Sequence, residues 1–239
     1  MPFGVGVKPR LAPTSRACRA IIAARESGPE LGEAALRALQ LMQFTTTGLL
    51  DDDDDLLAAL STVPGLNAEA VVGRIDDPDL ISAYESDRAC ARTAEGKPTH
   101  VQSRHADTDG KIRFTAPSVI FEHPGGERLE VGGFQPFEAY DTALANLEPS
   151  LARRRPPASA AEALAAFPRG LATAEVASIL RAELDESDIA AAQKELIELA
   201  GGGGAICEPA GADAIWRPLA QAPQEAPMRL APQSSTRSQ

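Results

Sequence analysis

The chain contains 239 residues, of which 44% are hydrophobic and 24% are charged, enough for one large domain or two modest ones. Its formal net charge of −11 at pH 7 repels a phosphate backbone, so we expect no nucleic-acid partner. No stretch approaches the roughly 18 to 20 apolar residues that span a bilayer, and residues 1–11 lack the apolar core of a secretory signal. Abundant alanine and only 4% aromatic residues predict a helix-rich protein. Because the sequence shows neither a membrane span nor a secretory segment, we expect it to be cytoplasmic and to bind no membrane.

The three cysteines, Cys18, Cys90 and Cys207, are odd in number and far apart in the sequence. A disulfide framework in an exported protein requires an even set. We therefore predict reduced, unpaired thiols. No Cys-x-x-Cys motif occurs in the chain.

Five short helices are predicted before residue 95, and capping residues mark several of their starts. Ser15 is the predicted N-cap of the first helix, and Asn67 is that of the fourth. Asp77 followed by Pro78 combines a cap with a proline in the first helical turn. The predicted ranges are 17–25, 30–44, 55–63, 68–75 and 78–92.

Two sets of residues raise the question of a metal site. A calcium loop alternates its oxygen ligands with spacers and a turn glycine, unlike the continuous run Asp51–Asp55, so this run is interpreted as a solvated loop that caps the next helix. His100 and His105 are five residues apart and match no helical pair of ligands. We predict no metal site from either set, nor from the other candidates, which are Asp107, Asp109 and His123.

After a polar loop over residues 96–110, the chain changes to a strand-like composition over 111–122, interrupted by Pro117. Gly125 and Gly126 predict a turn, and residues 127–131 predict the returning strand of a hairpin. A helix is predicted over 136–147.

The last part of the chain predicts a separate small module. Arg153–Pro157 has the composition of a linker. Helix starts are predicted at Ser159, which forms a capping box with Glu162, at Thr173 and at Ser187. A hairpin then follows, so the order of elements is that of a winged-helix module. Residues 159–218 hold four basic and ten acidic side chains, which favours a structural or protein-docking role over DNA binding.

Two segments around the predicted hairpin share a recognisable pattern. Residues 114–121 read Phe-Thr-Ala-Pro-Ser-Val-Ile-Phe, and residues 132–140 read Gly-Gly-Phe-Gln-Pro-Phe-Glu-Ala-Tyr. They resemble the cis-proline loop with its following strand, and the Gly-x-Gln-Pro-x-Glu step into the last helix, of the DsbA family of thioredoxin-like proteins. That family includes FrnE-like proteins and 2-hydroxychromene-2-carboxylate isomerases. The helical block before the hairpin resembles the family's helical insertion.

The resemblance implies a cis bond before Pro117 and a substrate-binding role for Thr115, Ala116 and Pro117, whose backbone would pair with an extended substrate. It also implies that the family's first strand and Cys-x-x-Cys helix are missing, because only about fifteen residues precede the helical insertion. No intact catalytic motif is therefore expected, and Cys18 is a weak candidate for a nucleophile. A truncated gene model, a degraded gene and a true short form all fit this absence.

Two classes of function follow from these observations. The first is a DsbA-like thiol–disulfide oxidoreductase acting on protein or peptide thiols, or a glutathione-dependent isomerase-type relative that would take glutathione as its cofactor. The second is a non-catalytic, thioredoxin-like module that binds peptides or proteins through the Pro117 loop and the C-terminal module. Without the missing strands, the hairpin would expose a sheet edge, which predicts a homodimer through that edge, aggregation or poor solubility.

The predicted fold is α+β and helix-rich, an incomplete thioredoxin-like fold with a winged-helix-like C-terminal module. The predicted units are an irregular N-terminus at 1–13, a DsbA-like domain at 14–150 with its insertion at 14–95 and its hairpin and final helix at 111–149, a linker at 151–158, the module at 159–218 and a disordered tail at 219–239.

Overall fold

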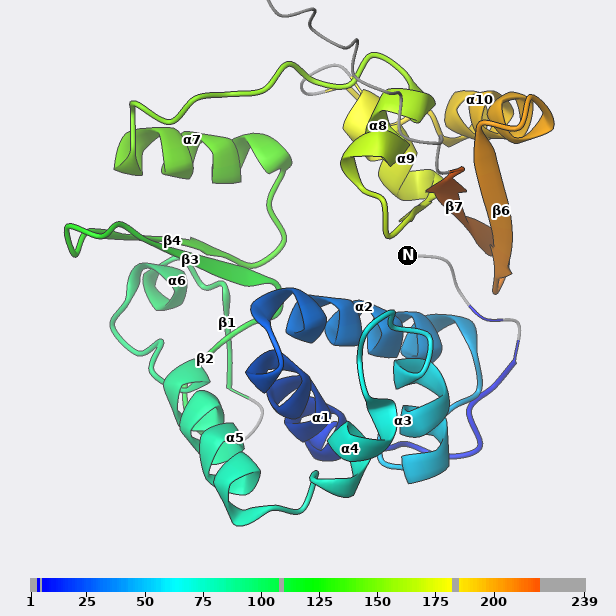
Figure 1. The fold of residues 1–239 in the computed structure, drawn as a ribbon. Helices are drawn as coiled ribbons and strands as arrows, with labels where there is room; N and C mark the ends of the chain where they lie inside the picture. The colour runs from blue at the N-terminus through cyan, green and yellow to red at the C-terminus, as the bar shows by residue number, and fades with distance from the viewer. Residues whose placement is uncertain (1–3, 5, 108–109, 182–184, 220–239) are drawn as a thin grey trace, which may run out of the picture.

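The computed structural model describes residue 4 and residues 6–107, 110–181 and 185–219, which Figure 1 shows as a ribbon. The predicted tail lies outside these described residues from residue 220 onward. The protein belongs to the α+β class, about 48% helical with small antiparallel sheets, so the helix-rich α+β prediction is confirmed. None of the described helices combines the length and the apolar character that crossing a bilayer requires.

All five helices predicted in the first part of the chain are present, and they pack on one another (Figure 1). Residues 6–13 before them contain no helix or strand, as predicted. The bounds are α1 Ser15–Glu26, α2 Pro29–Thr45, α3 Asp53–Leu60, α4 Ala68–Gly73 and α5 Pro78–Ala91.

Small residues let α1 and α2 approach closely. Ala20 and Ala24 of α1 are fully buried, and a Cβ atom placed on Gly32 of α2 would lie only 2.9 Å from the Cβ of Arg25. Larger side chains such as Leu56 fill the rest of this core, with no exposed surface. Each such side chain contributes about 1.5–3 kcal/mol on burial, so this helical block holds a core of its own.

Asp52 and Asn67 cap the helices that follow them, as predicted, but the acidic run is not all loop, because Asp53, Asp54 and Asp55 form the first turn of α3. The Asp52 carboxylate accepts hydrogen bonds from the backbone N–H groups of Asp54 and Asp55, both at 3.1 Å, and so caps α3. The Asn67 side chain accepts from the N–H of Ala70 at 3.0 Å and caps α4. These bonds satisfy N–H groups that the helix itself leaves unpaired.

The predicted cap at Ser15 is wrong, and the one at Asp77 is confirmed in position but not in its hydrogen bond. Ser15 is the first residue of α1, and Thr14 occupies the N-cap position without a side-chain hydrogen bond. Asp77 does occupy the N-cap of α5, but its carboxylate accepts instead from Nε of Arg74 at 3.1 Å. A guanidinium competes for the carboxylate that the helix end would otherwise use.

The middle of the chain holds two pairs of short strands and α7. The predicted loop over 96–110 is wrong in part, because a helical turn and a two-residue strand lie within it. The strand was missed because its antiparallel pairing, His105 with Phe114, depends on a partner after the loop. The bounds are α6 Pro98–Val101, β1 His105–Ala106, β2 Arg113–Phe114, β3 Ser118–Glu122, β4 Arg128–Gly132 and α7 Phe137–Leu147.

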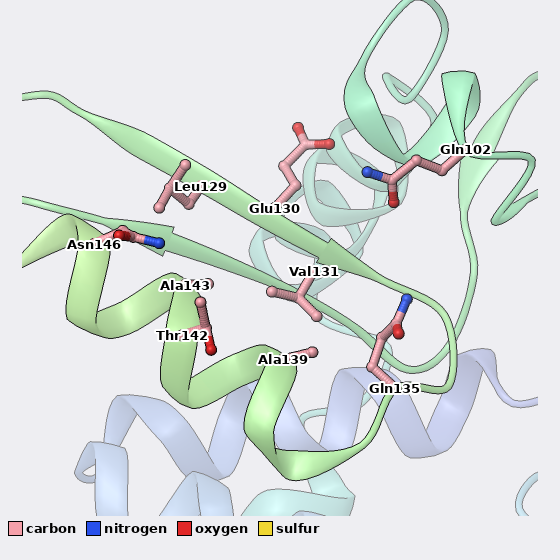
Figure 2. A pocket seen from close by; sticks show the side chains of 9 residues that line it. All are labelled: Gln102, Leu129, Glu130, Val131, Gln135, Ala139, Thr142, Ala143 and Asn146. Carbon is pink, nitrogen blue, oxygen red and sulfur yellow. The ribbon is translucent and has the colours of Figure 1, made fainter.

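The predicted hairpin is present as β3 and β4, which turn through Gly126 at φ +96°. Its register pairs Val119 with Val131 and Phe121 with Leu129, and α7 covers the face that carries Leu129 and Val131 (Figure 2). Val131 is the one buried side chain in β3, β4 and α7. This unit therefore has much less core than the helical block.

In its described residues the C-terminal module has three helices and a three-stranded antiparallel sheet in the order β5-β7-β6. Its core centres on Leu164, Val176, Leu196 and Trp216. The Thr173 hydroxyl donates to Asp213 at 2.6 Å and accepts from the indole N–H of Trp216 at 2.9 Å. The bounds are α8 Ala160–Ala166, β5 Leu171–Ala172, α9 Thr173–Leu180, α10 Ile189–Gly201, β6 Ala205–Ala210 and β7 Asp213–Pro218.

Only the first of the three predicted caps in this module is confirmed. The Ser159 hydroxyl accepts from the N–H of Glu162 at 3.2 Å. Thr173 is the first residue of α9, and its hydroxyl donates a hydrogen bond to Asp213 of the sheet instead of capping the helix. Ser187 precedes the true cap of α10, Asp188, whose carboxylate accepts from the N–H of Ala191 at 2.9 Å.

Ion pairs link the C-terminal module to the rest of the protein. Arg37 of α2 donates to both carboxylate oxygens of Glu175 in α9, at 2.8 and 2.6 Å. Arg181 donates to Glu138 of α7 at 2.8 Å. The two large apolar cores, by contrast, are separate clusters.

Candidate functional site

The loop that the sequence singled out lies between β2 and β3. Ala116 and Pro117 are exposed and Thr115 is half-buried, and the Ala116–Pro117 peptide bond is cis, the configuration that the family resemblance implies. The Ser118 hydroxyl donates to the carbonyl of Thr115 across the loop. The backbone N–H and C=O of Ala116 make no hydrogen bond within the described part of the chain, so both are open to a partner.

The free backbone continues along the outer edge of β3. His123 donates its N–H to the carbonyl of Glu127 at 2.9 Å, and in an antiparallel pair such hydrogen-bonded positions alternate with positions that point away. Val119 and Phe121 therefore direct their backbone groups at β4, whereas Ser118, Ile120 and Glu122 direct theirs outward. Since β3 and β4 form a two-stranded sheet, no described strand pairs with this outer edge.

Two exposed phenylalanines, which the sequence reasoning missed, lie at the same end of the hairpin as the loop. Ser118 pairs with Gly132, so the segment before β3 and the segment after β4 emerge together. Phe134 is 88% exposed and Phe137 is 69% exposed. Exposed aromatic side chains next to free backbone are typical of an interaction surface. The Gly-x-Gln-Pro-x-Glu pattern contained both residues, but it did not show that they stay uncovered.

The opposite edge of the hairpin borders a shallow hollow of about 310 Å³ between β4 and α7. Figure 2 shows Glu130 and Gln102 on one side of β4 and the small side chains of α7 on the other. Glu130 has a structural role, because its carboxylate accepts hydrogen bonds from the hydroxyl and the N–H of the buried Thr99 at 3.0 and 3.3 Å. The other lining residues are Leu129, Val131, Gln135, Ala139, Thr142, Ala143 and Asn146.

The cysteines lie in three different elements, and all three are free thiols. Cys18 is in the first turn of α1, inside the helical block. Burial raises the pKa of its thiol, although a hydrogen bond with Thr14 and the charge of Arg19 act in the opposite direction. Cys90 and Cys207 are exposed on α5 and β6. The structure thus brings no second thiol to Cys18.

The acidic run has protein partners for most of its carboxylates. Asp51 pairs with Arg10 at 2.7 Å, and this hydrogen bond lowers the pKa of Asp51. Asp53 pairs with Arg16 at 2.7 Å, and Asp55 accepts from the N–H of Leu49 at 2.8 Å. Because Asp52 caps α3, four of the five carboxylates in the run have partners within the protein, and we assign the run a structural role.

The histidines are also spread over the fold. The rings of His100 and His105 meet edge to face, with centroids 4.7 Å apart. His123 lies between Glu127 and Glu148, 3.2 Å from each. Nowhere among the described residues do three or more His, Cys, Asp or Glu side chains gather as metal ligands would; Asp109 lies outside those residues.

Comparison with known proteins adds no assignment. No protein-family model matches the chain, and no curated protein matches it significantly.

Proposed function

We propose that this protein is a non-catalytic peptide-binding module that takes up an extended segment along Thr115, Ala116 and Pro117 and onward along the outer edge of β3. In this proposal residues 14–150 are an incomplete thioredoxin-like fold, the C-terminal module is winged-helix-like, and the protein acts in the cytoplasm. The observation that carries the proposal is the free backbone of Ala116 at the open edge of β3. Main-chain hydrogen bonds to such an edge supply affinity that depends little on sequence.

Two exposed side chains at the same end of the hairpin support the same function. Phe134 and Phe137 offer apolar contact to the side chains of a bound segment. Glu138, the next residue, is held by Arg181, so the start of α7 is anchored while the two phenylalanines stay exposed. A fixed surface loses less entropy on binding than a mobile one.

Thiol chemistry gives the catalytic alternatives less support. Thiol–disulfide exchange needs a thiolate, and burial raises the pKa of Cys18. An oxidoreductase acting on protein thiols would need that thiolate and a resolving cysteine beside the Pro117 loop. A glutathione-dependent isomerase would need a glutathione site there. No observation on the described residues favours either one.

The test uses an unfolded protein whose thiols are blocked, so that binding cannot depend on disulfide exchange. Fluorescein-labelled, reduced and carboxymethylated α-lactalbumin is titrated with the full chain, and anisotropy reports binding. We expect saturable binding that the Phe134→Ala, Phe137→Ala double variant weakens at least about tenfold, the size of a hot-spot loss.

Phe167→Ala is the matched control, because Phe167 is an exposed phenylalanine of the C-terminal module, at 48%. It should bind like the unmodified chain. Absence of saturable binding, or equal weakening by the control, would contradict the proposed function.

A further inference from the structure

We propose that the open edge of β3 pairs with the same edge of a second copy of this chain, so that the two hairpins form one continuous four-stranded sheet. This inference rests on the proposed function, because it uses the edge that would accept an extended segment. It also adds regulation, since a copy paired in this way occupies the site and excludes the peptide.

The hydrogen-bonding pattern of β3 fits a two-fold arrangement. Ser118, Ile120 and Glu122 carry the outward backbone groups. Antiparallel pairing about an axis through Ile120 places Ile120 opposite the partner's Ile120, and Ser118 opposite the partner's Glu122. Each of these pairs exchanges two N–H···O bonds, and the run ends at Pro117, which has no N–H to donate.

The side chains of β3 are complementary in this register. Val119 lies opposite the partner's Phe121 on the face of the sheet that α7 covers, an aromatic and β-branched pair of the kind that stabilises sheets. Glu122 already pairs with Arg128 at 3.1 Å, and in this register it lies opposite the partner's Ser118, which is small and carries no charge. Centring the axis on Glu122 instead would set two carboxylates directly opposite each other, which is unfavourable.

The hairpin also has a physical reason to gain strands. A two-stranded hairpin is marginal in water unless further strands or a helix cover it, and α7 contributes no buried residue. Val119, Ile120 and Phe121 remain half-buried. The strand carries neither lysine nor an internal proline, two devices that block an edge, and its one charged residue, Glu122, is at its end. Pairing with a second copy would bury these side chains.

The test is sedimentation velocity of the full chain from low micromolar to several hundred micromolar. We expect a concentration-dependent shift from one chain to two. Ile120→Pro removes an outward N–H at the centre of the interface, so it should weaken dimerisation at least about tenfold, as expected for losing hydrogen bonds and side-chain packing. Arg128→Pro removes an outward N–H from the β4 edge instead, together with the ion pair to Glu122, and should weaken dimerisation far less than Ile120→Pro.

A second pair of variants tests the register without proline. Ser118→Lys should strengthen the dimer, because lysine would face the partner's Glu122, and Ser118→Glu should weaken it. Both variants lose the same hydrogen bond to Thr115, so folding effects cancel in the comparison. A single-chain mass at every concentration, or equal effects of the Ser118 variants, would overturn the inference.

The peptide assay separates this inference from the proposed function. Binding of carboxymethylated α-lactalbumin by a protein that stays monomeric would refute the dimer alone. A dimer that Ile120→Pro disrupts, without binding of α-lactalbumin by the unmodified chain at concentrations where it is monomeric, would refute the peptide-binding function alone. If both hold, added α-lactalbumin should convert dimer to monomer.

Discussion

Among single residues, Cys18 shows how burial can oppose the effect that the start of a helix has on the pKa of a thiol. The N–H groups at the start of a helix stabilise a thiolate, and Cys18 lies in the first turn of α1. Removal from water disfavours the same charge, and it is the largest influence on the pKa of this thiol, which it raises. The thiolate fraction at neutral pH is accordingly smaller than that of an exposed cysteine.

We therefore expect iodoacetamide to alkylate Cys18 more slowly than Cys90 and Cys207 at neutral pH, with peptide mass spectrometry following each site. Reduction of insulin in the presence of dithiothreitol should stay at background for both the unmodified chain and Cys18→Ser. Turnover that Cys18→Ser abolishes would restore the oxidoreductase alternative.

Thr173 provides a second residue-scale prediction. Its hydroxyl is buried between Asp213 and the indole of Trp216, so Thr173→Val leaves the indole N–H without its acceptor. A buried group left unpaired costs about 1–3 kcal/mol. Urea unfolding followed by the fluorescence of Trp216, the only tryptophan, should show this loss. Ser178→Ala, at an exposed serine of α9, should change stability far less.

At the scale of elements, α3 depends on the hydrogen bonds at its start. Asp52 pairs with two N–H groups, and Asp52→Ala should lower the free energy of unfolding by about 0.5–2 kcal/mol. Asp54→Ala is the control, because Asp54 is an exposed acidic residue in the first turn of the same helix. Thermal unfolding by circular dichroism should place Asp52→Ala below the control. Equal midpoints would mean that only the negative charge near the helix start matters.

At the scale of the whole molecule, charged side chains hold the C-terminal module to the helical block and to α7. Arg37 binds Glu175 with two hydrogen bonds, and Arg181 pairs with Glu138. The pKa of Glu138 is lowered, first by its own backbone N–H and then by Arg181. A carboxyl with a lowered pKa stabilises the folded form above its ordinary pKa, and this contribution is lost as the pH falls through the lowered value.

We therefore expect the docked arrangement to persist at neutral pH and to loosen in acid below the usual carboxyl range, and also in high salt, which screens exposed pairs. Arg37→Glu should increase the radius of gyration measured by small-angle X-ray scattering at low salt, and adding Glu175→Arg should reverse part of that increase. Arg25→Ala is the control, because Arg25 pairs with Asp87 within the helical block. An Arg37→Glu protein as compact as the control would contradict docking by ion pairs.

Patterns within a few residues of one another predicted much of this architecture. The five first helices, the hairpin with its glycine turn and α7 were all expected. Asn67 and Ser159 cap their helices because the N–H groups they accept from are three residues away. The missed pieces are short and depend on distant partners, as β1 does on β2. The prediction that Thr115, Ala116 and Pro117 bind a substrate stays a prediction.

The positions of the helices and of the hairpin follow from local sequence, because helix starts, turns and apolar periodicity act between near neighbours in the chain. The partner of each polar side chain depends on the fold: Asp77 pairs with Arg74, and Thr173 bonds to Asp213 and Trp216. The tertiary structure also decided that β3 keeps an open edge and that Phe134 and Phe137 stay exposed. Polar and apolar groups compete for partners, and each group contacts the most favourable partner that folding brings near it, which can lie anywhere in the chain.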